Sequence, residues 1–222
     1  MQVMVAMSGG VDSSVAAAML RDQGHDVVGV TLKLWGGESD SGCCSVSDVD
    51  DARRVAQQLE IDHLVFNFSE DFDRDVVEPY VADHARGITP NPCIECNRHL
   101  KFDRLMARAE ALGFDVVATG HHAQVVRTAD GRPRLTRGAD FAKDQSYVLH
   151  MLKASQLENV MFPIGGMTKD DVRKRATELG LRTAGKPDSQ DVCFISHTGG
   201  GRRVFLGNRI DMHPGRLVDK TG

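Results

Sequence analysis

Residues 3–14 read VMVAMSGGVDSS, and this stretch decides the fold. An apolar strand runs directly into Ser-Gly-Gly-Val-Asp-Ser, and an alanine-rich helix follows at once. The glycines permit a tight turn and a close backbone approach to an anion, while the N–H groups and dipole of the new helix face that anion. The stretch therefore predicts a phosphate-binding loop. An ordinary strand-to-helix turn capped by Ser8 or Asp12 is the simpler alternative.

Two common phosphate loops do not fit this stretch. It lacks the Gly-Lys-Ser/Thr ending of the Walker-type loop, and it lacks the Gly-x-Gly-x-x-Gly spacing of dinucleotide folds. A bare carboxylate beside phosphates is repulsive, so Asp12 makes sense if it helps to hold Mg²⁺.

The composition bounds the remaining classes. With 222 residues and a formal net charge of −4, the chain has room for one large domain, or one domain and a fragment, and does not look like a protein that coats nucleic acid. Local basic clusters remain, either as solvated edges or as RNA contacts. Their members are Arg127, Arg132, Arg134 and Arg137 around an expected hairpin, and Arg202 and Arg203 later in the chain.

The amino terminus reads as a core strand and not as a signal peptide, and no stretch is long enough to span a membrane. Five cysteines, an odd number, favour reactive, metal-bound or unpaired thiols over a disulfide framework. We therefore expect a cytoplasmic protein with no membrane partner.

Strand and helix patterns alternate through the first two-thirds of the chain. The expected strands are 2–7, 26–34, 63–67 and 115–119, and the expected helices are 13–23, 48–59, 71–85 and 98–112. A hairpin over 125–136, a helix over 147–153 and a helix from Thr168 to Gly180 should follow. These patterns predict an α/β fold with a doubly wound parallel sheet.

In such a sheet, ligands bind beyond the carboxyl ends of the strands. The phosphate loop, Leu32 and Gly120 should therefore meet at one edge. After Ser196 the composition changes and becomes rich in glycine. We expect 196–222 to be a linker and the truncated start of a small β module, with its first strand and turn at 214–219.

Two further segments carry cysteines. Residues 89–97 read TPNPCIECN, which places Cys93 and Cys96 in a proline-stiffened loop just before the helix expected near Arg98. The positive field of a helix amino terminus favours thiolate there. Residues 186–195 read KPDSQDVCFI, which places Cys193 at a boundary between loop and core.

The loop from Ser8 to Ser13 matches the PP-loop of the ATP pyrophosphatases. Together with the two cysteine segments, in this order, it resembles the tRNA-specific 2-thiouridylase family over nearly the whole chain. The resemblance implies an adenine nucleotide α-hydrolase-like PP-loop domain over 1–195, with a helical part that contacts tRNA at about 140–195.

The family's chemistry is the ATP-dependent 2-thiolation of the wobble uridine of tRNA. The resemblance implies that uridine O2 is adenylated, that a persulfide on Cys193 attacks the activated carbon, and that Cys96 resolves the intermediate into a Cys96–Cys193 disulfide. It also implies a sulfur donor, either a cysteine desulfurase or a sulfur-carrier protein, and a reductant. ATP and Mg²⁺ would be required.

The family's binding positions carry over by motif. Those for ATP are Ala6, Met7, Ser8, Gly9, Gly10, Val11, Asp12, Ser13, Leu32 and Gly120. Those for the flipped target base are Asn91, Pro92 and Cys93. Those for tRNA are His121, Lys143, Asp144 and Gln145, although His121 is otherwise read as a residue that caps a strand end, and Lys143 with Asp144 as an ordinary exposed pair.

One position departs from the pattern. Some family members have an aspartate where this chain has Cys93, so a general acid or base role is doubtful there. An alternative is that Cys93, Cys96 and Cys193 ligate a 4Fe–4S cluster that delivers the sulfur, without a persulfide on Cys193. Adjacent Cys43 and Cys44 are read as thiols without a metal or redox role.

Two rival functions remain open on the sequence. One is another PP-loop adenylating ligase or amidotransferase, against which the three thiols argue because amide formation needs none. The other is a noncatalytic module that binds nucleotide or tRNA. Release of AMP and pyrophosphate in the presence of tRNA separates catalysis from binding.

Overall fold

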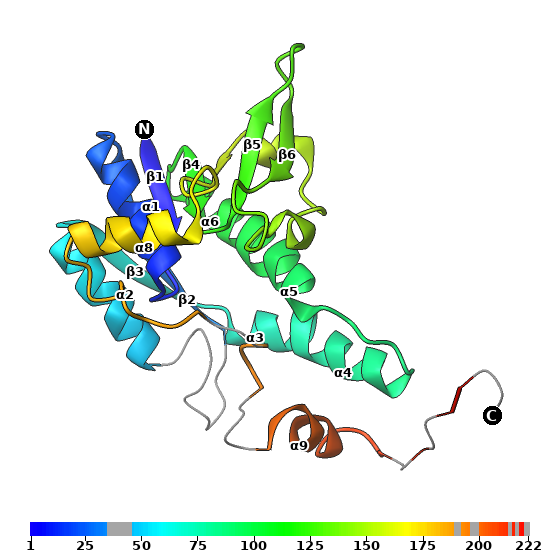
Figure 1. Ribbon diagram of the computed structural model, residues 1–222. Coiled ribbons are helices and arrows are strands. Elements are labelled where there is room, and N and C mark those ends of the chain that lie inside the picture. The colour runs from blue at the N-terminus through cyan, green and yellow to red at the C-terminus, as the bar shows by residue number, and fades with distance from the viewer. Residues whose placement is uncertain (35–45, 189–191, 196–199, 213–214, 216–217, 220–222) are drawn as a thin grey trace.

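The computed structural model describes residues 1–34, 46–188, 192–195, 200–212, 215 and 218–219. Its centre is a five-stranded parallel sheet in the order β3-β2-β1-β4-β7 (Figure 1). The strands are β1 (Gln2–Ala6), β2 (Asp26–Lys33), β3 (Asp62–Asn67), β4 (Val116–Thr119) and β7 (Val160–Met161). The expected parallel sheet is confirmed, and β7 adds an edge strand of two residues that the sequence pattern did not predict.

Helices cover both faces of the sheet, as expected for a doubly wound fold. On one face lie α1 (Val11–Asp22), α2 (Val46–Gln58) and α8 (Lys169–Glu178), and on the other α3 (Ser69–Phe72), α4 (Glu78–Ala85) and α6 (Leu105–Ala111). Helix α5 (Pro92–Glu95) packs through Ile94 against a separate apolar cluster that contains Phe102. The central strand alternates between them, because Val3 and Val5 join the first apolar cluster and Met4 joins the second. Residues 73–77 continue α3 into α4, and residues 96–104 continue α5 into α6, each with π-helical bonding.

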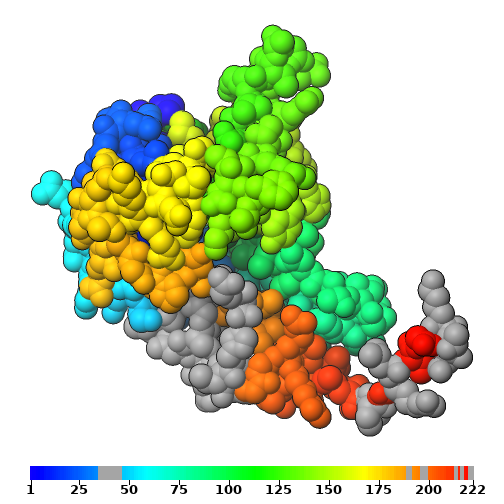
Figure 2. Space-filling model, in the orientation of Figure 1, coloured from blue at the N-terminus to red at the C-terminus, as the bar shows by residue number. Residues whose placement is uncertain are grey.

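The expected hairpin is present as β5 (Ala123–Arg127) and β6 (Pro133–Arg137), which pair antiparallel. It projects from the body of the molecule (Figures 1 and 2). Gly131 in the turn has a φ of +80°, a conformation that favours glycine. A third apolar cluster around Phe102, Ala123 and Leu149 holds the base of the hairpin.

The expected helix over 147–153 is wrong. The structure has one 3-10 turn, Ser146–Val148, and only later the short helix α7 (Ala154–Leu157). Asp144 accepts hydrogen bonds from both the backbone and the hydroxyl of Ser146, and the following backbone bonds, from Leu149 N to Ser146 O and from Leu152 N to Leu149 O, span three residues. This local bonding favours tight turns over an α-helix.

Residues 201–207 form helix α9 (Gly201–Gly207), which the sequence analysis did not predict because glycines dominate its start. Leu206 is buried in the second apolar cluster, and the ring of Phe205 packs against those of Tyr80 and Phe194. Of the β-strand expected at 214–219, residues 214, 216 and 217 lie outside the described residues, and residues 215, 218 and 219 are not in a strand. None of the described helices has the length and apolarity that crossing a bilayer requires.

Candidate active site

The loop between β1 and α1 is braced by its own serines. Ser13 Oγ accepts a hydrogen bond from Ser8 N at 3.2 Å and donates one to Gly10 O at 3.2 Å, and Ser14 Oγ donates to the same carbonyl at 2.8 Å. Gly9 has a φ of +72°, and a Cβ there would lie 2.3 Å from the backbone oxygen of Asp48. Only glycine fits at this position, because both its conformation and its surroundings exclude a side chain.

The same loop presents unused donors. Helix α1 begins at Val11 after the extended residue Gly10, and no side chain caps it. Among the described residues, no acceptor takes the backbone N–H of Gly10, Val11 or Asp12. Open donors at the positive end of a 12-residue helix form an anion-binding site.

Two other predicted ATP positions lie at this edge of the sheet. Gly120 follows β4, and a Cβ there would lie 2.5 Å from Ser13 N, so the end of β4 touches the first turn of α1. Leu32 is buried near the carboxyl end of β2, the neighbour of β1 on the other side. The structure therefore brings the loop, Leu32 and Gly120 to one edge, as expected.

Asp12 points to partners that the sequence did not identify. Lys169 Nζ donates to both carboxylate oxygens, at 2.7 and 2.8 Å, and His122 Nε2 lies 3.3 Å from Oδ1. Burial tends to raise the pKa of Asp12, but the hydrogen bonds from His122 and Lys169 and their charges lower it overall. The carboxylate is therefore ionised at neutral pH. It pairs with Lys169, which is buried and only 8% exposed.

Lys169 also connects Asp12 to the segment before Cys193. Asp188 accepts hydrogen bonds or ion pairs from Lys143, Lys169 and Arg173, each at 2.8 Å. Burial would raise the pKa of Asp188, but the hydrogen bonds from Lys143 and Lys169 outweigh it and lower the pKa to about 2. The chain is thereby fastened to helix α8 five residues before Cys193.

We expect Asp188→Asn to lower the free energy of unfolding by about 2 kcal/mol at pH 7. Because the folded-state pKa lies below that of the unfolded chain, the stabilisation is complete above about pH 5 and is lost as the pH falls from about 4 through 2. Urea unfolding of both proteins at pH 7, 5, 4 and 3 measures this. A difference between wild type and variant that does not shrink toward pH 3 would contradict the ion-pair account.

The acids at the start of α2 also face a lysine. Lys186 Nζ donates to Asp48 at 2.6 Å, to Asp51 at 2.7 Å and to the backbone oxygen of Gly9 at 3.0 Å. The described residues contain no group of three or more His, Cys, Asp or Glu side chains placed to hold a metal ion. Cys93, Cys96 and Cys193 are among these described residues.

The expected start of the cysteine-bearing helix near Arg98 is wrong. The helix begins at Pro92, with Asn91 as its N-cap, and Asn91 Oδ1 accepts a hydrogen bond from Cys93 N at 3.0 Å. Cys93 therefore lies exposed in the first turn, and Cys96 directly follows α5. A thiol this close to a helix amino terminus lies in the positive field of the helix dipole, which stabilises the thiolate form.

Cys96 and Cys193 pack against the same apolar cluster, although they are far apart in sequence. Phe194, the residue after Cys193, is 3% exposed, and its ring contacts those of Phe72, Tyr80 and Phe205 with centroids 5.3–5.6 Å away. The aromatic contacts fix the backbone beside Cys193. The structure thus brings the two predicted catalytic cysteines to one cluster.

The predicted tRNA residues make internal contacts. His121 is 8% exposed, shares a hydrogen bond of 2.7 Å with Thr119 Oγ1, and has its pKa lowered well below the usual value by burial. Asp144 accepts from the backbone of Gly138, and Gln145 Oε1 accepts from His122 N at 3.0 Å. These contacts order the loop beside Asp12, and the tRNA role of these residues stays a prediction.

A chain of contacts links this loop to the cysteine helix. Buried Asn97, next to Cys96, donates through Nδ2 to the backbone oxygen of Val148 at 3.3 Å. Val148 N in turn donates to Gln145 O, and Gln145 N donates to His122 O. The arrangement places the phosphate loop and Cys96 on one connected scaffold.

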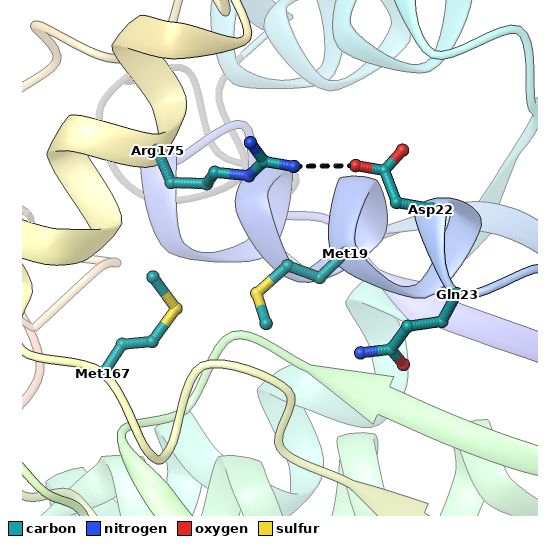
Figure 3. Close-up of a pocket in the computed structure, with 5 residues that line it drawn as sticks. All are labelled: Met19, Asp22, Gln23, Met167 and Arg175. Carbon is teal, nitrogen blue, oxygen red and sulfur yellow. Dashed lines mark hydrogen bonds and ion pairs between the residues drawn. The ribbon is translucent and has the colours of Figure 1, made fainter.

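A shallow pocket lies at the other end of α1 (Figure 3). Its lining includes Met19, Met167 and the ion pair between Arg175 and Asp22, whose atoms are 2.9 Å apart. Asp22 is the last residue of α1 and Val11 the first, so a whole helix separates this pocket from the phosphate loop. The pocket is not part of the anion site.

The fold and the loop together define an α/β domain of the PP-loop class. Residues 1–197 match the family described as the tRNA methyl transferase HUP domain, and the chain belongs to that family.

Curated relatives cover the whole chain. It is similar to the tRNA-specific 2-thiouridylase MnmA of Clostridium perfringens, with 47% identity in an alignment of 226 positions that covers 100% of this chain and 63% of that protein. It is also similar to the MnmA of Mycolicibacterium smegmatis, with 53% identity in an alignment of 227 positions that covers 100% of this chain and 62% of that protein. The resemblance to tRNA-specific 2-thiouridylases is confirmed, and the chain spans less than two thirds of the length of these relatives.

Solved structures support the fold. The U34-tRNA thiolase NcsA from Methanococcus maripaludis, described with its 4Fe–4S cluster, matches with a TM-score of 0.55 and 17% identity over 86% of this chain and 61% of that chain. A 4-thiouridine synthetase in complex with RNA and ATP matches with a TM-score of 0.51 and 18% identity over 87% of this chain and 44% of that chain. At these identities the matches establish the shared PP-loop fold.

Proposed function

We propose that this chain is the adenylating and sulfur-transferring part of a tRNA-specific 2-thiouridylase. The observation that carries the proposal is the combination on one scaffold of an anion loop with open N–H groups and two cysteines that share one apolar cluster. The identity of 47–53% to proteins named for this activity supports it.

In the first step, uridine O2 attacks the α-phosphorus of ATP, and pyrophosphate leaves. The open N–H groups of the loop bind phosphate oxygens and stabilise the charge that builds up on them. Asp12, already ionised, offers carboxylate oxygens of the kind that Mg²⁺ prefers, next to those N–H groups. When bound there with ATP, Mg²⁺ would neutralise phosphate charge.

In the second step, the terminal sulfur of a persulfide on Cys193 attacks C2 of the adenylated uridine, and AMP leaves. The Cys96 thiolate then attacks the inner sulfur, the S–S bond of the persulfide breaks, and a Cys96–Cys193 disulfide forms. The new sulfur stays on the base. An external reductant restores the two thiols, and a cysteine desulfurase or sulfur-carrier protein reloads Cys193.

The alternative in which Cys93, Cys96 and Cys193 hold a 4Fe–4S cluster that supplies the sulfur stays a prediction. We assign the second step to the Cys193 persulfide because it needs only the two cysteines that share one apolar cluster.

The projecting hairpin is the surface that we assign to tRNA, with Asn91, Pro92 and Cys93 beside the flipped base. Its arginines carry charge opposite to that of the phosphate backbone. Phe141, which is 77% exposed, lies under the guanidinium of Arg137 at 5.3 Å, and an exposed ring of this kind can stack on an unpaired base. We expect a protein that acts on tRNA in this way to work in the cytoplasm.

The test incubates the protein with ATP, Mg²⁺, tRNA and a sulfur donor, and measures AMP, pyrophosphate and 2-thiouridine by chromatography and mass spectrometry. We expect AMP release that requires tRNA, together with thiouridine. AMP formation without tRNA would favour another adenylating ligase or amidotransferase. Binding of ATP and tRNA without any turnover would favour a noncatalytic module.

A further inference from the structure

Lys186 reaches the phosphate loop from a segment far away in sequence. Its Nζ donates to the carbonyl oxygen of Gly9 at 3.0 Å and to two carboxylates of α2. The Lys186 side chain is 28% exposed. Burial tends to lower the pKa of Lys186, but the hydrogen bonds to Asp48 and Asp51 raise it overall. The ammonium group of Lys186 is therefore charged at neutral pH.

The bond to Gly9 determines where the next N–H points. In a trans peptide, the carbonyl of one residue and the N–H of the next point in opposite directions. Lys186 holds the Gly9 carbonyl on its own side, so the Gly10 N–H points away from it. That N–H is one of the open donors of the loop, with no acceptor among the described residues.

The need for such a fixing contact follows from the two glycines. Gly9 and Gly10 have no side chains, so their shared peptide can rotate more freely than any other in the loop. The backbone of Asp48 leaves no space for a Cβ on Gly9. Lys186 and Asp48 therefore both restrict this peptide.

We propose that Lys186 is a positioning residue for nucleotide binding, an inference that rests on the proposed ATP site. Lys186 fixes the Gly9–Gly10 peptide so that the Gly10 N–H faces the phosphates. Lys186 contacts the loop through the carbonyl oxygen of Gly9 and does not itself bind the nucleotide. Arg173 keeps it in place, because its guanidinium donates to the backbone oxygens of Ala184 and Lys186.

The test measures the Kd of Mg²⁺-ATP by isothermal titration calorimetry, using the full 222-residue chain. We expect Lys186→Met to raise this Kd at least about tenfold, since a charge-assisted hydrogen bond is lost and one phosphate donor is no longer oriented. Lys186→Arg, which can still donate to Gly9, should recover most of the affinity. Thermal melting of each variant verifies that it folds.

Arg182→Met is the matched control, because Arg182 forms an ion pair with Asp51 at 3.0 Å without a contact to Gly9. It should leave the Kd for ATP unchanged. The double variant Asp48→Asn, Asp51→Asn removes the ion pairs of Lys186 but leaves its bond to Gly9, so it should bind ATP at least as tightly as wild type.

The outcomes separate the two proposals. If wild type binds ATP and Lys186→Met binds it equally well, the inference about Lys186 is overturned while the proposed function stands. If the Asp48, Asp51 double variant loses as much affinity as Lys186→Met, the ion pairs and not the peptide contact matter, and the inference is also overturned. If wild type itself does not bind ATP, the proposed function fails.

Discussion

Replacing Cys193 by serine is expected to reduce 2-thiouridine formation by at least about a thousandfold, while the Kd for ATP stays unchanged. A serine oxygen cannot carry a transferable sulfur, so the second step has no donor atom. The phosphate loop should be unaffected, because its open donors are backbone N–H groups at the start of α1, whereas Cys193 packs against the second apolar cluster. Thiouridine is measured by mass spectrometry of digested tRNA, and ATP binding by calorimetry.

Cys93→Ser is the informative companion variant. A persulfide relay needs only Cys96 and Cys193, so this variant should keep thiolation within about tenfold of wild type, whereas a cluster held by three thiolates would lose its function. Iron and sulfide analysis after anaerobic purification gives an independent measure. Unimpaired thiouridine formation in Cys193→Ser would remove Cys193 from the sulfur relay.

Replacing Asp12 by alanine is expected to lower the rate of AMP formation by at least about a hundredfold, with the fold intact. The change removes the carboxylate that would hold Mg²⁺ and takes away one of the two carboxylates that pair with Lys169. Lys169 keeps its ion pair with Asp188 at 2.8 Å, so the structure tolerates the loss. Pyrophosphate release gives the rate, and circular dichroism with thermal melting tests the fold.

The matched control is Asp22→Ala, at the other end of the same helix. Asp22 accepts an ion pair from Arg175 of α8 just as Asp12 does from Lys169, but it lies beside the pocket of Figure 3 and not at the phosphate loop. This variant should form AMP at the wild-type rate. AMP formation at a normal rate in Asp12→Ala would mean that the loop has been misread.

The parts of the fold that follow local rules were predictable. The parallel sheet, the hairpin turn at Gly131 and the start of α8 after Thr168 are all confirmed, and Thr168 Oγ1 does accept a hydrogen bond from Asp171 N. Each of these depends on strand periodicity, turn residues or a capping side chain, which short stretches of sequence specify.

The start of the cysteine helix could have been found from the sequence. Asn91 followed by Pro92 is a good N-cap followed by a good first residue, but two prolines in one segment favoured a loop in our interpretation. Helix α9 is a different case, because glycines precede its first residue, Gly201, in the sequence and obscured a short apolar run that becomes helical by packing on the core.

The lysines around the phosphate loop could not have been found in this way. Lys169 and Lys186 reach Asp12 and Gly9 from positions more than 150 residues away, and nothing near either lysine in sequence indicates its partner. Such contacts depend on how α8 and the segment after it pack against the sheet. Tertiary packing determines them, and a single sequence does not display it.

The contact between Gly120 and Ser13 has a mechanical consequence. With a virtual Cβ only 2.5 Å from a backbone nitrogen, the end of β4 and the first turn of α1 leave no slack between them. The end of β4 and the first turn of α1 therefore behave as one stiff block that cannot change shape around an incoming ligand. Any adjustment during turnover has to come from the side chains that contact these two elements. Lysines suit that role because their side chains are long and flexible.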